Sequence, residues 1–264
     1  MSTAHSTGLP RRHWLYSIVG TVLLFLVLPV CIVIPESFSD SKYLSFPPPG
    51  FSLKWYSAFL SSDDWLSSAR ASLVAATLTM LFATPVGVAS AYAISNLGPR
   101  FQRISMAFIL LPVIVPSMLI AIGIFYVYIR LSLVNTMLGI VLAHSILAIP
   151  FVIVTLLSAL RSFDLRQELV ARSLGAPRFA AFWRVTLPQI RPAVISAALF
   201  AFIISLDEVI VSLFVAGGNN MVLTRRMFVA LRDALDPTIA AISTFFVVVS
   251  LAVLGTVALL SRKR

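Results

Sequence analysis

The chain alternates long apolar runs with short polar intervals. A helix needs about 20 mainly apolar residues to cross the hydrocarbon core of a bilayer. The runs therefore predict six transmembrane helices, at about residues 15–35, 68–95, 104–129, 136–160, 192–216 and 238–261. The interval 161–191 differs from the other polar intervals because it is long and its apolar residues recur at helical spacing. We predict a single all-α integral membrane domain that covers residues 1–264.

The first apolar run, from Leu15 to Ile34, has two possible interpretations. It follows Arg11 and Arg12, as the apolar region of a signal peptide would. It is, however, longer than the apolar region of most signal peptides, and no small-x-small cleavage site follows it. We interpret it as an uncleaved first span.

The interval 36–65 predicts a surface segment between the first two spans. Three prolines in the sequence FPPPGF exclude a helix there. The aromatic residues that follow suit a short helix lying along the membrane surface. Asp63 or Asp64 is expected to cap the span that comes next.

Several polar or helix-bending residues lie inside the apolar runs. Pro85, Pro112, Pro116 and Pro150 predict kinks, which membrane helices tolerate when neighbouring groups satisfy the freed carbonyls. His144 is a lone polar residue in the fourth run. Its expected role is a hydrogen bond between helices, and the alternative is direct contact with a transported molecule.

The first half of the interval 161–191 predicts a short helix from about Asp164 to Leu174. Leu165, Leu169 and Ala171 lie on one face of this helix. It is expected to stop at Gly175, because glycine readily adopts the left-handed conformation found just past a helix end.

The second half of this interval predicts another short helix. Pro177 suits its start, because the missing N–H of a first-turn residue has no partner in the helix. Phe179, Phe182 and Trp183 follow at helical spacing, and Pro188 is expected to end the helix. Six arginines, two acids and this aromatic group favour a docking surface. The alternative is a solvated basic loop that binds anionic lipid.

Composition supports a membrane protein and argues against a nucleic-acid partner. The chain is 59% hydrophobic and 11% charged, whereas soluble proteins carry roughly 25% charged residues. The net charge of +10 would suit nucleic acid only on a folded soluble domain with a basic face. Here the basic residues lie between apolar runs. The single cysteine, Cys31, supports neither a disulfide framework nor a metal site.

The distribution of basic residues predicts the orientation in the membrane. Counted on alternate sides of the six runs, 13 Lys and Arg fall on the side of both termini and the interval 161–191, and 7 fall on the other side. Because basic loops stay in the cytoplasm, we expect both termini and this interval to be cytoplasmic.

The interval 161–191 resembles the EAA signature in the membrane subunits of binding-protein-dependent ABC importers. That signature reads Glu-Ala-Ala, three residues, Gly, nine residues and Ile-x-Leu-Pro. Gly175 and the sequence Val-Thr-Leu-Pro ending at Pro188 keep this spacing. The Glu-Ala-Ala positions fall on Leu169–Ala171, where only the last residue matches. Glu168 lies one place before the expected glutamate, which puts the family's charge contact at that position in doubt.

The resemblance implies that this coupling loop fits into a groove of an ATPase subunit. The implied docking residues are Leu169, Ala171, Gly175, Phe179, Phe182, Trp183, Leu187 and Pro188. It also implies a type I ABC importer permease architecture (MetI-like) in a bacterial inner membrane. The implied partners are the ATPase subunits, a periplasmic solute-binding protein and a second permease subunit, either a copy or a related chain, that completes the pore.

The chain itself has no motif for ATP hydrolysis. No Gly-x4-Gly-Lys-Ser/Thr loop occurs in it. No arrangement of residues for enzymatic chemistry is found either. We expect no cofactor on this chain and ATP on the partner subunit.

Asp207 and Glu208 lie in the outer half of the fifth predicted span. An acid at mid-membrane costs on the order of 3 kcal/mol on insertion scales, so such residues face a cavity or a partner. The functional hypothesis is that one acid lies on the route of a cationic substrate while the other pairs with Arg130, Arg225 or Arg226. The alternative is a structural ion pair or a helix cap.

Two further segments resemble the spermidine/putrescine branch of these permeases. They are SLDEVIVSLFVAG, from Ser205 to Gly217, and DPTIAAIST, from Asp236 to Thr244. The resemblance implies import of a small, polyamine-like cation, with opines, amino-acid derivatives and phosphonates as alternatives. An ion-coupled secondary transporter would predict an inverted repeat, and none is found. A membrane scaffold without transport activity would need no acids within a span.

Overall fold

A computed structural model describes residues 13–43, 45–164, 166–233 and 236–262. Arg11, Arg12, Leu165, Lys263 and Arg264, which entered the sequence analysis, lie outside these ranges. The described chain is almost entirely helical, as predicted. Its α-helices are α1 (His13–Glu36), α2 (Lys54–Ser61), α3 (Asp63–Ser95), α4 (Pro99–Ile114), α5 (Ser117–Leu131), α6 (Met137–Ser162), α7 (Arg166–Ser173), α8 (Arg178–Ala181), α9 (Leu187–Asp207), α10 (Ile210–Val215), α11 (Leu223–Asp233) and α12 (Thr238–Arg262). A π-helix, η1 (Phe182–Thr186), and a 3-10 turn, η2 (Gly218–Asn220), complete the set.

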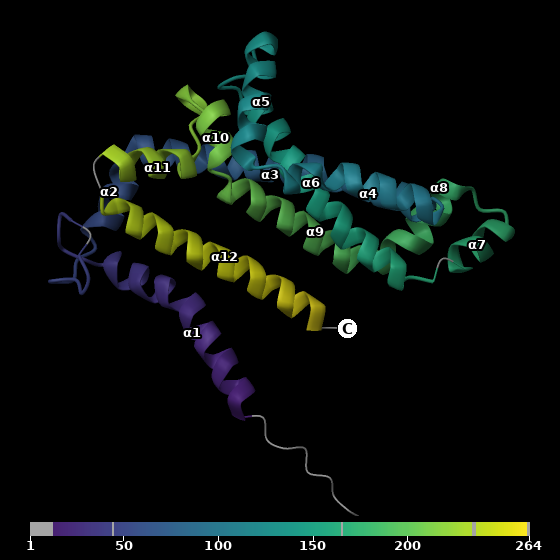
Figure 1. Cartoon of the computed structure of the whole chain (residues 1–264), viewed down its shortest axis with the longest axis horizontal. Coiled ribbons are helices and arrows are strands. Elements are labelled where there is room, and N and C mark those ends of the chain that lie inside the picture. Colours follow the sequence, from purple (N-terminus) through teal and green to yellow (C-terminus); the bar gives the residue numbers. More distant parts are fainter. Residues whose placement is uncertain (1–12, 44, 165, 234–235, 263–264) are drawn as a thin grey trace, which may run out of the picture.

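The core of the molecule is formed by α3, α6 and α9, which pack side by side (Figure 1). Small residues on α3 allow this close approach: Ala83 and Ala91 are fully buried. A Cβ added at Gly87 would lie 2.3 Å from the side chain of Val152 on α6. Without a side chain at this point, the two helix backbones come closer than ordinary residues permit.

Four helical stretches in the described chain are long and apolar enough to cross a membrane. They are Trp14–Glu36, Asp63–Ser95, Met137–Ser162 and Arg178–Asp207. The first three coincide closely with the predicted spans. A further apolar helical segment, Thr238–Ala252 at the start of α12, is shorter. The total of six spans therefore stays a prediction.

The third predicted span, 104–129, is not one continuous helix. It is divided into α4 and α5, whose axes differ by 94°, and Figure 1 shows α5 projecting from the core while α4 follows it. Pro116 has no N–H to donate, and its ring disfavours helical geometry at Val115, which is extended with ψ of 134°. The sequence predicted a kink here, but the bend is close to a right angle.

The fifth predicted span, 192–216, is also divided, and it starts earlier than predicted. Helix α9 begins at Leu187 and ends at Asp207. Glu208 is extended, with ψ of 111°, and the chain resumes as the short helix α10. The two acids therefore mark a break between helices.

The end of the molecule that carries α2 and α11 is held by contacts to the start of α3. Arg226 on α11 forms an ion pair of 3.1 Å with Asp64 and donates a 2.7 Å hydrogen bond to Ser68. The prediction that Asp63 or Asp64 caps α3 is wrong, because the side chain of Ser62 accepts the hydrogen bond from Trp65 N. The acids follow in the first turn, where negative charge suits the helix dipole.

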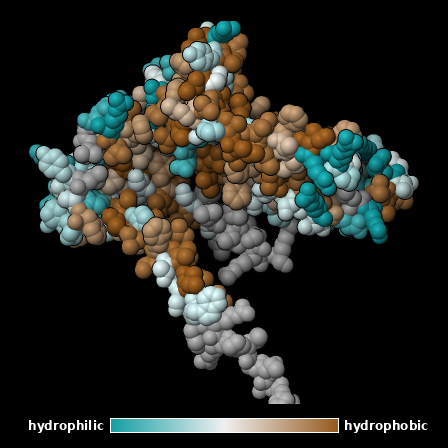
Figure 2. Space-filling model, in the orientation of Figure 1, coloured by the Kyte–Doolittle hydropathy of each residue, from teal (hydrophilic) through white to brown (hydrophobic). Residues whose placement is uncertain are grey.

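The surface divides by polarity along the molecule. Figure 2 shows hydrophobic side chains over the middle, a group of hydrophilic ones at the end that carries α7 and α8, and further hydrophilic ones at the opposite end. Helix α1 is exposed along most of its apolar length. An apolar surface of this kind requires lipid or another chain to cover it.

Candidate functional site

The coupling loop lies at one end of the α3, α6 and α9 bundle (Figure 1). Helix α7 occupies the first half, as predicted, though it is shorter than the range from Asp164 to Leu174. Gly175 follows with φ of +96°, a left-handed conformation that glycine adopts at little cost. Helix α8 then starts directly after Pro177. The turn between two short helices is thus where the sequence placed it.

The prediction that Pro188 ends the second helix is wrong. The chain stays helical from Arg178 through η1 and α9 to Asp207. Pro188 lies in the first two residues of α9, directly after the π-helix. Within this wider turn, Leu187 N donates to Phe182 O, five residues back, instead of four. The wider turn accommodates a proline that would strain a regular α-helix.

The outer surface of the loop carries a group of exposed apolar side chains, here called the apolar tip. Leu174 is 84% exposed and Phe179 is 74% exposed. The complete tip consists of Leu169, Val170, Leu174, Phe179 and Trp183. Exposed arginines alternate with these apolar residues along the loop. Large apolar side chains gathered in this way on a polar end mark a surface that binds a partner.

The eight predicted docking residues divide into two groups. Leu169, Phe179 and Trp183 belong to the apolar tip, and Gly175 and Pro188 are also exposed. In contrast, Ala171, Phe182 and Leu187 are half-buried. The ring of Phe182 packs against Tyr92 of α3 with centroids 4.6 Å apart, and Leu187 packs on the hydrophobic core. These three residues therefore lie on the inner side of the loop and are not part of its exposed surface.

Sequence reasoning missed the most buried charged residue of the loop. Glu168 is 5% exposed, and its carboxylate accepts hydrogen bonds from Tyr92 Oη at 2.5 Å and from Thr186 Oγ1 at 2.7 Å. Tyr92 lies 76 residues away in the sequence. No local pattern could have identified this contact.

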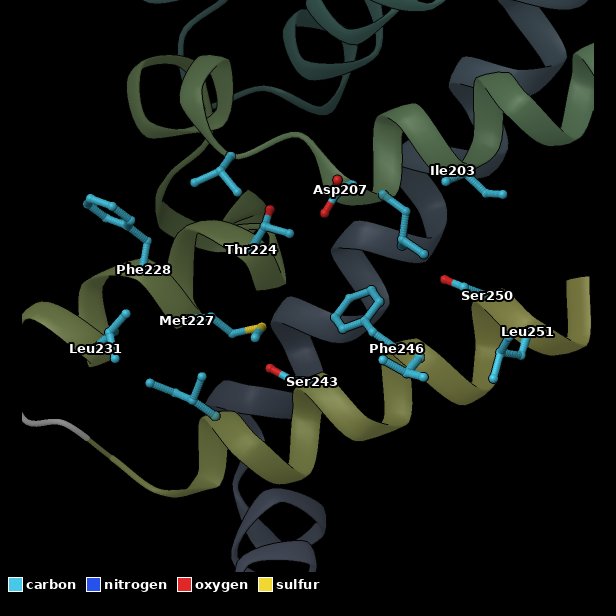
Figure 3. Close-up of a pocket in the computed structure, with 14 residues that line it drawn as sticks. Ile203, Asp207, Thr224, Met227, Phe228, Leu231, Ser243, Phe246, Ser250 and Leu251 are labelled. Carbon is cyan, nitrogen blue, oxygen red and sulfur yellow. The ribbon is translucent and has the colours of Figure 1, made fainter. Parts of the chain in front are cut away.

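Asp207 lies beside a cavity of about 580 Å³ between α9, α11 and α12. Figure 3 shows Asp207 at the end of α9, with Ser243, Phe246 and Ser250 of α12 across the same space. Most of the lining is apolar. The residues that line the cavity are Ile203, Leu206, Asp207, Val209, Thr224, Met227, Phe228, Leu231, Ile239, Ser243, Phe246, Val247, Ser250 and Leu251. The structure gives the Asp207 carboxylate no ion pair within the described residues.

Glu208 has a structural contact. Its Oε1 accepts a hydrogen bond of 2.8 Å from Val211 N, so the side chain caps the start of α10. Its backbone carbonyl accepts hydrogen bonds from Ser212 Oγ and Thr224 Oγ1. The two adjacent acids therefore have different surroundings, one beside a cavity and one at a helix cap.

The expected pairing of one acid with Arg130, Arg225 or Arg226 is wrong for the part of the chain that the structure describes. Arg226 pairs with Asp64 instead. Arg225 donates to the carbonyl of Ser212 at 3.5 Å, and burial lowers the pKa of its guanidinium. Among the described residues, neither acid forms an ion pair with any of these three arginines.

The structure thus combines a bundle of apolar helices, a basic docking end with an apolar tip, and an acid beside a cavity near the opposite end. This combination belongs to the class of membrane permease subunits of ABC importers. The chain is a member of the family described as binding-protein-dependent transport system inner membrane component, which it matches over residues 83–264. It is a multi-pass inner-membrane transport component, and membership implies ATPase and binding-protein partners.

Individual relatives agree with this assignment. The chain is 28% identical over 243 residues to the spermidine/putrescine transport system permease protein PotC of Escherichia coli (strain K12), covering 92% of each chain. It is 30% identical over 241 residues to the putrescine transport system permease protein PotI of the same strain, covering 89% of this chain and 85% of PotI.

A solved structure has the same fold. It is a bacterial alginate ABC transporter in complex with an alginate pentasaccharide-bound periplasmic protein, and the matching chain has a TM-score of 0.70 at 17% identity. The match covers 96% of this chain and 95% of the other. The predicted fold class and the predicted importer permease function are confirmed.

Proposed function

We propose that this chain is a permease subunit of an ATP-driven polyamine importer that moves its substrate from the periplasm to the cytoplasm. ATP is bound and hydrolysed by ATPase subunits docked on the coupling loop. A second permease subunit completes the pore, and a periplasmic binding protein delivers the substrate. The two relatives described above are permeases of spermidine and putrescine systems, which supports this substrate class.

The observation that carries the proposal is the carboxylate of Asp207, which has no ion pair among the described residues and lies beside a mainly apolar cavity. A polyamine combines ammonium groups with aliphatic segments, so it needs negative charge and apolar walls together. Asp207 supplies the charge. Met227, Phe228 and Phe246 supply an apolar surface, and aromatic faces also attract ammonium groups. The cavity volume lies within the usual range of about 300–1,000 Å³ for small-molecule sites.

The same chemistry argues against the anionic alternatives. A phosphonate would meet the carboxylate of Asp207 as a like charge, and an acid beside an anion in a low-dielectric site is strongly unfavourable. Opines and other amino-acid derivatives carry both a positive and a negative charge, so only their ammonium group would interact favourably with the carboxylate of Asp207.

A reconstituted uptake assay tests the proposal. The chain is placed in proteoliposomes with its ATPase, its second permease and its binding protein, and ATP-dependent uptake of labelled spermidine and putrescine is measured. We expect uptake that unlabelled polyamines inhibit and that an opine or a phosphonate does not. ATP-dependent uptake of a phosphonate without uptake of either amine would overturn the substrate assignment.

A further inference from the structure

Three residues hold the coupling loop to the transmembrane helices, and we call them the Glu168 latch. Glu168 on α7 accepts hydrogen bonds from Tyr92 on α3 and from Thr186 on η1. Thr186 is fully buried. Burying a carboxylate is costly unless hydrogen bonds replace its water, and bonds to a charged acceptor are about twice as strong as neutral ones. The two hydrogen bonds of the latch therefore hold α7 in one position against α3 and η1.

Ring contacts support the latch on its outer side. Tyr92 packs against Phe182, and the guanidinium of Arg178 lies 5.5 Å from the Tyr92 ring centroid. Arg178 Nε also donates to Tyr92 Oη at 3.5 Å. One tyrosine of α3 thus contacts α7, α8 and η1 together. Tyr92 is therefore the residue of α3 through which a displacement of these elements would reach that helix.

Other contacts would hold α7 less firmly. Helix α7 packs mainly on α8 and η1, which are themselves parts of the coupling loop. An exposed hydrogen bond of 2.5 Å from Gln189 to Gln167 adds one contact to α9. At an exposed site such a bond exchanges readily with water and contributes little. In the part of the chain that the structure describes, the hydrogen bond between Glu168 and Tyr92 is the polar contact that joins α7 to α3.

The latch explains the departure from the EAA signature. The glutamate of the signature would stand at Leu169, which is 55% exposed on the apolar tip. In this chain the carboxylate is one residue earlier, and adjacent residues on a helix point about 100° apart. This shift turns the charge of Glu168 from the docking surface toward the bundle.

We propose that Glu168 is a positioning residue for energy coupling, because it transmits movement of the docked loop to α3 and α9 through Tyr92 and Thr186. This inference rests on the proposed function of the chain as an ATP-driven permease. Without the latch, α7 would follow the ATPase while α3 lagged behind. Hydrolysis would then continue with less transport.

The first test removes both hydrogen-bond donors and keeps the size of the side chains. In the reconstituted complex, Tyr92→Phe combined with Thr186→Val should retain bound ATPase and ATP hydrolysis. Substrate transported per ATP should fall at least about fivefold, the lower end of typical coupling between sites. Tyr126→Phe combined with Thr155→Val removes the same atoms at an exposed position of α5 and a half-buried position of α6, where the Thr155 hydroxyl bonds to Phe151 of its own helix, and should leave the ratio unchanged. An unchanged ratio in the latch variant would overturn the proposal.

A second measurement does not depend on transport or on the substrate. Amide hydrogen exchange of residues 166–173 is followed in the purified chain without ATPase. Exchange should be faster in the latch variant than in wild type or in the control, and Glu168→Gln, which keeps one acceptor oxygen, should be intermediate. Equal exchange in all four proteins would overturn the latch. If the wild-type chain failed to bind an ATPase, the proposed function would fail, and exchange would still decide whether the latch exists.

Discussion

His144 on α6 and Ser205 on α9 are joined by a hydrogen bond of 2.8 Å between Nδ1 and Oγ in the buried interior. The second ring nitrogen of His144 lies 3.0 Å from Ser212 Oγ on α10. Ser205 also donates to Thr79 Oγ1 on α3 at 3.3 Å. One imidazole therefore connects the helices on both sides of the break at Glu208. The expected role of His144 as a hydrogen bond between helices is confirmed.

His144→Ala should lower the stability of the purified chain by about 2–3 kcal/mol, because it leaves a cavity and removes two buried hydrogen bonds. Ser212→Ala removes one of them together with the Ser212 bond to the Glu208 carbonyl, and it should cost about 1 kcal/mol. Thermal unfolding in detergent, monitored by size-exclusion chromatography, shows which of the two substitutions lowers the stability more. Thr155→Val serves as the control, since the Thr155 hydroxyl bonds only within its own helix. A stability of His144→Ala equal to that control would contradict the structural role.

Gly87→Ala should destabilise the chain by about 1–3 kcal/mol through overpacking. The added Cβ would meet the Val152 side chain at 2.3 Å, so α3 and α6 must separate. The matched control is Gly20→Ala on α1, where nothing lies within 4 Å. An alanine in an open helical position is favourable by roughly 0.5–1 kcal/mol. The two substitutions should therefore shift the unfolding temperature in opposite directions.

Asp207→Asn should reduce uptake of labelled spermidine about tenfold, because a hydrogen bond to a charged group contributes roughly 1.5–3 kcal/mol. Assembly with the partner subunits should not change, because Asp207 forms no ion pair within the described residues and the substitution therefore breaks none. Asp233→Asn removes the same charge from an exposed position at the end of α11 and should have little effect. Uptake in Asp207→Asn equal to that in Asp233→Asn would remove this carboxylate from the substrate route.

Trp183→Asp should release the ATPase while the permease still inserts into the membrane. Trp183 is 52% exposed on the apolar tip, so its replacement leaves the fold intact. Loss of an aromatic anchor typically costs 2 kcal/mol or more, which weakens binding by roughly 30-fold. Copurification of the ATPase with the tagged permease measures the effect. Phe101→Asp, at a 64% exposed position in the first turn of α4, is the control. Retention of the ATPase by Trp183→Asp would count against the docking surface.

The parts of the fold that the sequence predicts well are those set by the length of an apolar run. The fourth predicted span, 136–160, matches α6, with Thr136 as its N-cap. The same holds for α1 and α3, because burial in lipid demands uninterrupted helix. Gly175 was also predictable, since its conformation is a local requirement.

The remaining features depend on contacts between distant segments. A proline such as Pro116 predicts a kink, but neighbouring helices decide how far the chain turns. The end of α9 at Asp207 has neither proline nor glycine to mark it; Glu208 stops the helix by capping α10. Burial of Glu168 likewise depends on Tyr92, which comes from another helix.

Because of the π-helix at Phe182–Thr186, the number of residues in the coupling loop sets the orientation of its side chains as well as its length. A π turn contains one more residue than an α turn, so the side chains that follow are rotated by about 100° relative to those before it. Within η1, Trp183 is exposed on the apolar tip, whereas Thr186 at the last position is buried and donates to Glu168. Deleting a single residue between Gly175 and Pro188 would turn one of these two surfaces away from its target. The chain length of this segment therefore sets an angle, and insertions or deletions there should be tolerated far less than substitutions.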